Sequence, residues 1–370
     1  MNEQLFKQLT QAKQASRHMM TMNTQSKNQA LIKIAQALKD HVLEIINENQ
    51  KDIEHAKASG MSDAMVDRLL LNEDRIVAMA DDVLKLVSLD DPVGDIIREI
   101  KRPNGLLIKQ VRVPIGIFGI IYESRPNVTV DIACLCIKSG NVCVLKGGKE
   151  AMHSNRILTK LMREAIKETL PVDCVQLIDY GGREMVDELI HAYGYVDVVV
   201  PRGGAGLIQH VVQNATVPVI ETGAGNCHLY IDKEADLKKA IDITVNAKIQ
   251  RPSVCNAIET ILVHQDIADT YLPLLYEAFH ERVDIRGDSK VQKIIPCQLA
   301  TLTDYATEYD DYIVAVKIVD SLKEAIEHIY QYSTKHSEAI ITENQDTAHM
   351  FLNSIDSACV YHNASTRFSD

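Results

Sequence analysis

The sequence contains no long run of lysine or arginine, and its 39 basic and 51 acidic residues give a formal charge of −12. A phosphate backbone would be repelled by most of such a surface, which argues against nucleic-acid binding. No apolar stretch approaches the roughly 20 residues that a membrane helix requires. Glu3 and Lys7 also interrupt the region where a signal peptide would be apolar. We therefore expect a cytoplasmic protein.

The eight cysteines form no CxxC pair and show no Cys/His spacing typical of a zinc site. We expect them to be reduced thiols, most of them buried as small core residues. The chain also lacks internal repeats and low-complexity segments. With 370 residues, 46% of them hydrophobic and 24% charged, it has the composition of a globular enzyme with two or three domains.

The first ninety residues show helical spacing of apolar side chains almost throughout. The pattern predicts one long amphipathic helix over 23–57 and further helices over 63–71 and 73–89. Two stretches rich in β-formers follow, at 96–100 and 106–113, with Asn104-Gly105 between them. That dipeptide predicts a long projecting β-hairpin.

Beyond Pro114 short apolar runs alternate with helical stretches, a pattern that indicates parallel α/β sheets. A second α/β unit is predicted to begin near residue 230, with helices at 237–248, 322–330 and 346–353. The predicted strands of both units are 115–122, 142–146, 175–178, 196–200, 217–220, 229–232, 257–263, 313–319, 339–342 and 358–362.

Glycine-rich turns follow three of these strands, at 146–149, 202–206 and 221–226. Glycine lets the backbone approach a ligand, and amides at the start of a following helix can hold phosphate. None of the turns completes the GxGxxG dinucleotide fingerprint. Each could be an ordinary tight turn, although three of them at strand ends along one sheet favour a nucleotide site.

Cys255 differs from the other cysteines because Pro252 breaks the preceding helix and leaves it in a loop near Arg251. The loop allows a nucleophile, although the sequence context by itself favours a small buried hydrophobic side chain. Cys134, Cys136 and Cys143 lie in apolar segments and are expected in the core. Neighbours on a strand point to opposite faces, so Cys227-His228 is not expected to form a dyad. Glu221 could be a general base or could order its glycine turn.

Several motifs resemble the gamma-glutamyl phosphate reductases, a branch of the aldehyde dehydrogenase superfamily, and the resemblance covers essentially the whole chain. Glu221 precedes Cys255 by 34 residues, which matches the spacing of the glutamate and the catalytic cysteine in aldehyde dehydrogenases. The motifs are VPIGIFGIIYESRPNVT at 113–129, VPRGGAG at 200–206, ETGAGNCH at 221–228, QRPSVCN at 250–256 and HNASTRF at 362–368.

The resemblance implies an α/β, aldehyde-dehydrogenase-like fold, with a Rossmann-type NADP-binding domain (1–95 and 113–228), an α/β catalytic domain (229–362) and a β-hairpin oligomerisation arm (96–112). It also implies NADPH-dependent reduction of L-glutamate 5-phosphate to L-glutamate 5-semialdehyde and phosphate in proline biosynthesis. Cys255 would be the nucleophile, through a thioacyl intermediate. Asn127 would assist as an oxyanion donor, and Glu221 is the third catalytic candidate.

By the same resemblance NADP(H) would be bound by Lys146, Gly203, Gly204, Gly206 and Glu308. Lys146 could equally be a strand-end lysine and Glu308 an exposed loop carboxylate. The substrate would be bound by Arg125, Arg251, Asn363, Ser365, Thr366 and Arg367. No metal is implied. A homo-oligomer is expected, with an upstream glutamate kinase as a partner for channelling.

The family usually continues beyond the STRF motif, so residues 363–370 are interpreted as the start of a truncated C-terminal segment. Two rival functions stay open. One is an aldehyde dehydrogenase that forms an acid without phosphate, with Glu221 as the base for hydrolysis. The other is a catalytically silent binding or scaffold protein. A cofactor-free thiol hydrolase would leave the glycine turns and Lys146 without a role.

Overall fold

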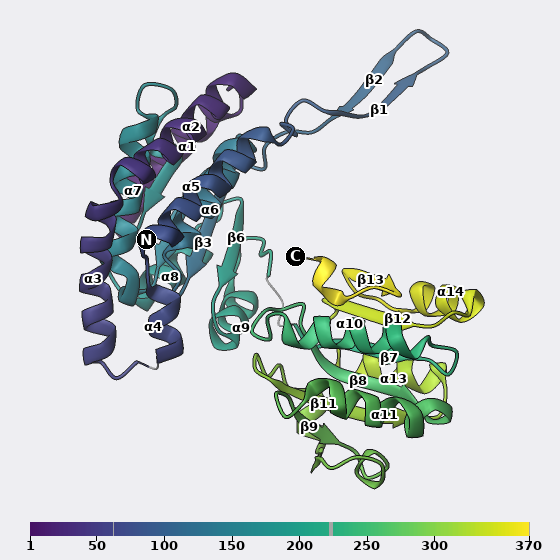
Figure 1. Cartoon of the computed structure of the whole chain (residues 1–370). Helices are drawn as coiled ribbons and strands as arrows, with labels where there is room; N and C mark the ends of the chain where they lie inside the picture. Colours follow the sequence, from purple (N-terminus) through teal and green to yellow (C-terminus); the bar gives the residue numbers. More distant parts are fainter. Residues whose placement is uncertain (62, 222–224, 370) are drawn as a thin grey trace. The chain divides into compact units, whose positions relative to one another are not determined.

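A computed structural model describes residues 1–61, 63–221 and 225–369, and the chain divides into two compact units, Met1–Thr222 and Gly223–Asp370 (Figure 1). The first unit begins with helices α1 (Glu3–Met19), α2 (Thr24–Asp40), α3 (Val42–Ala58), α4 (Asp63–Leu69) and α5 (Glu73–Ser88). The second unit begins before the first strand of its own sheet, whereas the sequence analysis placed the boundary after His228.

The single helix predicted over 23–57 is wrong, because the helical backbone is interrupted at His41, where φ is −113° and ψ is 23°. One straight helix of that length would span about 50 Å. Instead α2 and α3 both pack against α7 (Met152–Ile166), which is only about 22 Å long. The break at His41 lets both apolar faces reach the same support.

A four-stranded parallel sheet forms the centre of the first unit, in the order β5-β4-β3-β6. Its strands are β3 (Ile117–Tyr122), β4 (Val142–Gly147), β5 (Val175–Leu177) and β6 (Val198–Arg202), and the accompanying helices are α6 (Asn127–Lys138), α7, α8 (Arg183–Ile190) and α9 (Ala205–Asn214). The strand predicted at 217–220 is not formed. Only Val219 makes an isolated bridge to Val199, since Pro218 has no N–H to continue the ladder.

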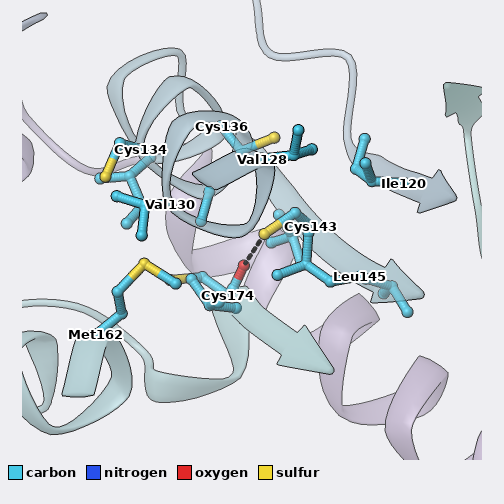
Figure 2. Close-up of a cluster of buried hydrophobic side chains, with 14 of the residues drawn as sticks. Ile120, Val128, Val130, Cys134, Cys136, Cys143, Leu145, Met162 and Cys174 are labelled. Carbon is cyan, nitrogen blue, oxygen red and sulfur yellow. Dashed lines mark hydrogen bonds between the residues drawn. The ribbon is translucent and has the colours of Figure 1, made fainter. Parts of the chain in front are cut away.

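Sulfur-containing side chains fill part of this core between α6, β4 and the segment before β5 (Figure 2). Cys134, Cys136, Cys143 and Cys174 are all buried, and the Cys143 thiol donates to the Cys174 carbonyl over 3.8 Å. Burial raises the pKa of Cys134 well above that of a free thiol. The prediction of core cysteines is confirmed, and all eight cysteines of the chain are free.

The predicted hairpin is present as β1 (Ile96–Lys101) and β2 (Leu107–Val111), which pair antiparallel. Gly105 adopts a φ of +87° in the connecting turn, a conformation that favours glycine. Nearly every hairpin residue is exposed, including the apolar residues Ile96, Ile97, Leu107, Ile108 and Val111. A two-stranded hairpin is at best marginally stable in water on its own.

The second unit contains a seven-stranded sheet whose pairs are all parallel, in the order β10-β9-β11-β8-β7-β12-β13. Sequence patterns did not predict α11, β9, β10 or α12. The strands are β7 (Cys227–Ile231), β8 (Ile258–His264), β9 (Asp284–Gly287), β10 (Gln298–Leu299), β11 (Ile313–Val319), β12 (Ser337–Ile341) and β13 (Cys359–His362). The helices are α10 (Leu237–Ile249), α11 (Gln265–Phe279), α12 (Leu302–Tyr305), α13 (Leu322–Tyr332) and α14 (Gln345–Ser354).

Short 3₁₀ turns complete the structure: η1 (Lys149–Ala151), η2 (Val172–Cys174), η3 (Val291–Lys293) and η4 (Thr366–Ser369). Within the described part of the chain, no helix combines the length and apolar character needed to cross a bilayer.

Candidate active site

Of the predicted cofactor residues, Lys146 and the glycines of 203–206 lie at the carboxyl ends of strands in the first unit, whereas Glu308 lies in the second. From β3 the chain moves to β4 and β5 on one side and then returns to β6 on the other side of β3. Such a reversal of strand order is the place where open parallel sheets bind ligands. Glu123 follows β3, Lys146 lies at the end of β4, and Gly203 follows β6.

The turn between β6 and α9 offers backbone donors to an anion. Gly204 caps α9, and its N–H donates to Glu123 Oε2 over 3.0 Å. A Cβ at Gly203 would lie 2.4 Å from the same carboxylate oxygen, whereas a Cβ at Gly206 would meet nothing within 4 Å. The helix start therefore holds a carboxylate with its backbone in this structure, which is donor chemistry suited to a phosphate.

Lys146 is almost fully buried, and its ammonium donates to the Tyr180 carbonyl over 3.4 Å. Burial lowers the pKa of Lys146, and nearby Lys149 lowers it further, while Glu184 opposes both effects. Sequence reasoning missed Lys149. A second cation in the same glycine turn after β4 was the signal that could have identified it.

Asn127 and Arg125 lie in the segment that leads into α6. Asn127 is the first helical residue, and its Nδ2 donates to Asp131 Oδ2 over 2.9 Å. Burial raises the pKa of Asp131 to about 6, and the hydrogen bond from Asn127 opposes that shift. Arg125 is half-buried. One amide N–H of Asn127 is thus engaged within its own helix.

In the second unit Cys255 lies in the loop between α10 and β8, as its sequence context predicted, and it is half-buried. Its carbonyl accepts a hydrogen bond from the Cys227 thiol over 3.2 Å. A Cβ built on Gly225 would lie 1.6 Å from the same carbonyl oxygen. Only glycine permits this approach, so the backbone at Cys255 is held tightly against the start of β7.

Glu308 lies beside the same loop, although 53 residues separate it from Cys255. Its Oε1 accepts the Gly225 N–H over 2.6 Å, and Gly225 in turn packs on the Cys255 carbonyl. The fold thus brings together two residues that the sequence analysis named for different tasks.

The C-terminal motif also meets the cysteine loop. The Thr366 hydroxyl is fully buried and donates to the Asn256 carbonyl over 2.6 Å. Asn256 Nδ2 donates to the Arg367 carbonyl over 3.4 Å, and Arg367 Nε donates to Gln250 Oε1 over 3.2 Å. Ser365 is buried and accepts the Arg367 N–H over 3.3 Å. Asn256 was not predicted as a functional residue, because its contacts arise from more than a hundred residues away.

Asn363 and Arg251 have different surroundings. Asn363 has a φ of +52°, and its side chain exchanges hydrogen bonds with the backbone of Thr342, so it fixes the end of β12. Arg251 is exposed beside Pro252. Neither residue has a described contact with Cys255.

The third glycine turn is only partly described. Glu221 is exposed, and residues 222–224 of the turn lie outside the described part of the chain. Cys227 and His228 are both buried on β7, and His228 Nδ1 lies 3.2 Å from Glu338 Oε2 rather than facing the neighbouring thiol. Among the described residues no group of three or more His, Cys, Asp or Glu could hold a metal ion.

Residues 2–292 match the model of the aldehyde dehydrogenase family. The chain is 54% identical to the gamma-glutamyl phosphate reductase of Petrotoga mobilis, over 100% of this chain and 89% of the relative, and 53% identical to that of Halothermothrix orenii with the same coverage. The crystal structure of the enzyme of that name from Thermotoga maritima is similar with a TM-score of 0.97 and 47% identity, over 100% of this chain and 90% of that one.

Proposed function

The chain belongs to the aldehyde dehydrogenase family, and from that premise we propose that it reduces L-glutamate 5-phosphate to L-glutamate 5-semialdehyde and phosphate with NADPH, a step of proline biosynthesis. The observation that carries the proposal is the half-buried Cys255 on a loop that binds the C-terminal motif and packs against Gly225, the residue that donates to Glu308. Full-length similarity to gamma-glutamyl phosphate reductases supports the choice of substrate.

The first unit has donors that fit a nicotinamide dinucleotide, the cofactor class of this family. Backbone amides at Gly203, Gly204 and Gly206 would receive its phosphates, because the start of α9 already holds the Glu123 carboxylate. Lys146, with Lys149 nearby, would hold the additional phosphate of NADPH, since two cations favour a dianion over a ribose hydroxyl. By its resemblance to the family, Glu308 of the second unit is proposed to hold the nicotinamide ribose. The two lysines support NADPH over NADH.

Cys255 would perform the covalent chemistry. Its thiolate attacks the acyl phosphate carbonyl, a C–S bond forms, and the C–O bond to phosphate breaks with phosphate as the leaving group. The cofactor, when bound, supplies the hydride that reduces the thioacyl carbon. The C–S bond then breaks, which releases the aldehyde and restores the thiolate.

Each of these steps develops negative charge on the carbonyl oxygen. The Cys255 N–H and an amide N–H of Asn127 are the proposed donors. Phosphate leaves readily and no water has to be activated, so Glu221 is assigned no role as a base in the reductive direction. An enzyme that hydrolyses the thioacyl group to an acid would require such a base.

The substrate carries a phosphate and an α-carboxylate. Arginine provides the planar, charged donors that bind both groups. Arg251 precedes Cys255 in the cysteine loop, and Arg367 belongs to the C-terminal motif that is bound to that loop through Gln250 and Asn256. The proposed substrate-binding residues are Arg125, Arg251, Asn363, Ser365, Thr366 and Arg367.

The exposed apolar hairpin β1–β2 would be the arm of a homo-oligomer, because a two-stranded hairpin with so much exposed apolar surface requires a covering partner. A kinase must supply the acyl phosphate, and glutamate kinase is the proposed upstream partner for channelling.

Two variants test the function. Cys255→Ala should abolish turnover and keep NADPH binding, while Cys359→Ala, a change at another half-buried cysteine, should leave turnover intact. Glu221→Gln should keep at least a third of the reductive rate. Substantial turnover by Cys255→Ala would remove Cys255 from the nucleophile role, and loss of activity in Glu221→Gln alone would favour an acid-forming dehydrogenase.

A further inference from the structure

A fully buried ion pair brackets the cysteine loop. Lys248 lies in the last turn of α10, Glu259 is the second residue of β8, and Lys248 Nζ lies 2.7 Å from Glu259 Oε2. Both side chains are at most 1% exposed. The loop that carries Cys255 connects these two residues, so the pair closes its base (Figure 1 shows α10 and β8 in the second unit).

Removing both charges from water carries a desolvation penalty that two apolar residues at these positions would not have. Burial raises the pKa of Glu259 to about 8 and lowers the pKa of Lys248, and the attraction between the two opposes both shifts. A pair with this desolvation penalty is poor at stabilising a fold but well suited to fixing one geometry.

Glu308 lies on a segment whose next acidic residues, Asp310 and Asp311, raise the pKa of Lys248, while the Asp310 backbone lowers the pKa of Glu259. Glu308 binds the Gly225 N–H, and Gly225 packs on the Cys255 carbonyl. The cysteine loop is therefore fixed at two places, at its base by the buried ion pair and at Cys255 by Gly225.

We propose that Lys248 and Glu259 are positioning residues, which hold the Cys255 loop in one fixed arrangement through their buried contact. Neither residue takes part in the bond-making steps described above. The expected effect on turnover rests on the proposed function. The expected effect on the position of the loop rests only on the contact between Lys248 and Glu259.

The test uses the full chain with Lys248→Met and Glu259→Gln combined, which removes both charges and nearly keeps both shapes. Lys239→Met is the matched control, since Lys239 lies on the same helix and forms an exposed ion pair with Glu343. Two quantities are measured: the steady-state constants in the phosphate-dependent oxidation of the semialdehyde, and the rate at which iodoacetamide alkylates Cys255. Cys297 and Cys359, which are also half-buried, serve as internal references for alkylation.

In the folded double variant we expect kcat to fall at least tenfold with KM for NADP⁺ within twofold of the wild type. We also expect alkylation of Cys255 to become at least threefold faster, because a released loop exposes the thiol, while Cys297 and Cys359 keep their rates. Lys239→Met should change none of these values. An unchanged alkylation rate of Cys255 in the folded double variant overturns the inference, whatever its turnover.

If the double variant does not fold, Glu259→Asp provides the same test. It keeps the charge, but its side chain is one methylene shorter, so the carboxylate is drawn away from Lys248. The alkylation measurement needs no catalysis. Absence of phosphate-dependent activity in the wild type would therefore refute the proposed function and leave the positioning inference to be decided by the thiol alone.

Discussion

The backbone amide of Gly225 donates to Glu308 Oε1 over 2.6 Å while the same glycine lies against the Cys255 carbonyl. One residue without a side chain thus joins the loop of the proposed nucleophile to a carboxylate from a distant segment. The contact leaves no room for a larger residue at position 225.

Gly225→Ala should be destabilised by about 1–3 kcal/mol, because its Cβ would overlap the Cys255 carbonyl oxygen and the backbone must shift. Turnover should fall at least tenfold, because the loop that carries Cys255 is displaced. Thermal unfolding and steady-state kinetics measure the two effects. Gly206→Ala is the control for stability alone, since a Cβ there meets nothing and should not destabilise the protein. Wild-type stability of Gly225→Ala would contradict the described packing.

Thr366→Val should lower the free energy of unfolding by about 1–3 kcal/mol, because the buried Asn256 carbonyl loses the hydroxyl that donates to it over 2.6 Å. Denaturant unfolding measures this cost. Thr10→Val removes a hydroxyl that forms an exposed hydrogen bond with the Phe6 carbonyl in α1, and it should change stability by less than about 0.5 kcal/mol. Equal effects of the two substitutions would show that the C-terminal motif is not anchored on the cysteine loop.

Asp131 gives a prediction for the pH dependence of stability. Its pKa is about 6 in the folded protein, above the ordinary value of about 3.9 for an unfolded chain. The folded state therefore binds this proton more tightly, and the contribution of Asp131 to stability is lost as pH rises from 4 through 6. Asn at position 131 cannot ionise. The free energy of unfolding of Asp131→Asn should therefore exceed that of the wild type by about 1–2 kcal/mol at pH 7.5.

The same advantage should vanish near pH 4, where Asp131 of the wild type is protonated in the folded protein. Urea unfolding of both proteins at pH 4.0, 5.5 and 7.5 measures the difference. A difference in stability that does not vary with pH would mean that Asp131 titrates normally.

Lys146→Met should lower kcat/KM for NADP⁺ at least tenfold and change kcat/KM for NAD⁺ by less than threefold, because the proposed partner of the lost charge is the additional phosphate, which NAD⁺ lacks. Lys149→Met should act in the same direction with a smaller effect. Lys160→Met is the control, since Lys160 is exposed on α7 and pairs with Glu44. A parallel loss with both cofactors would indicate damage to the sheet end instead of a lost phosphate contact.

Local patterns predicted much of the fold. Most strands lie within a few residues of their predicted positions, and Asn104-Gly105 correctly indicated the hairpin. The errors have physical causes. The helical spacing over 23–57 does not reveal a turn at His41, which tertiary contacts to α7 impose, and α11 contains Pro273, a residue that argues against a helix.

The candidate site was predictable only in part. Pro252 placed Cys255 in a loop, and its relation to Glu221 followed from the spacing typical of the family. The contacts of Glu308 with Gly225 and of Thr366 with the cysteine loop depend on strand order in a sheet that pairs distant segments. No local periodicity carries that information, and the same holds for the buried pair Lys248–Glu259.

The most direct test of the proposed activity mixes the full chain with glutamate 5-semialdehyde and NADP⁺, with and without inorganic phosphate, and follows NADPH formation at equal protein concentration. The thioacyl mechanism predicts NADPH only when phosphate is present, because phosphate must release the acyl group from Cys255. NADPH formation at the same rate without phosphate would contradict the account and indicate release of the acyl group by water.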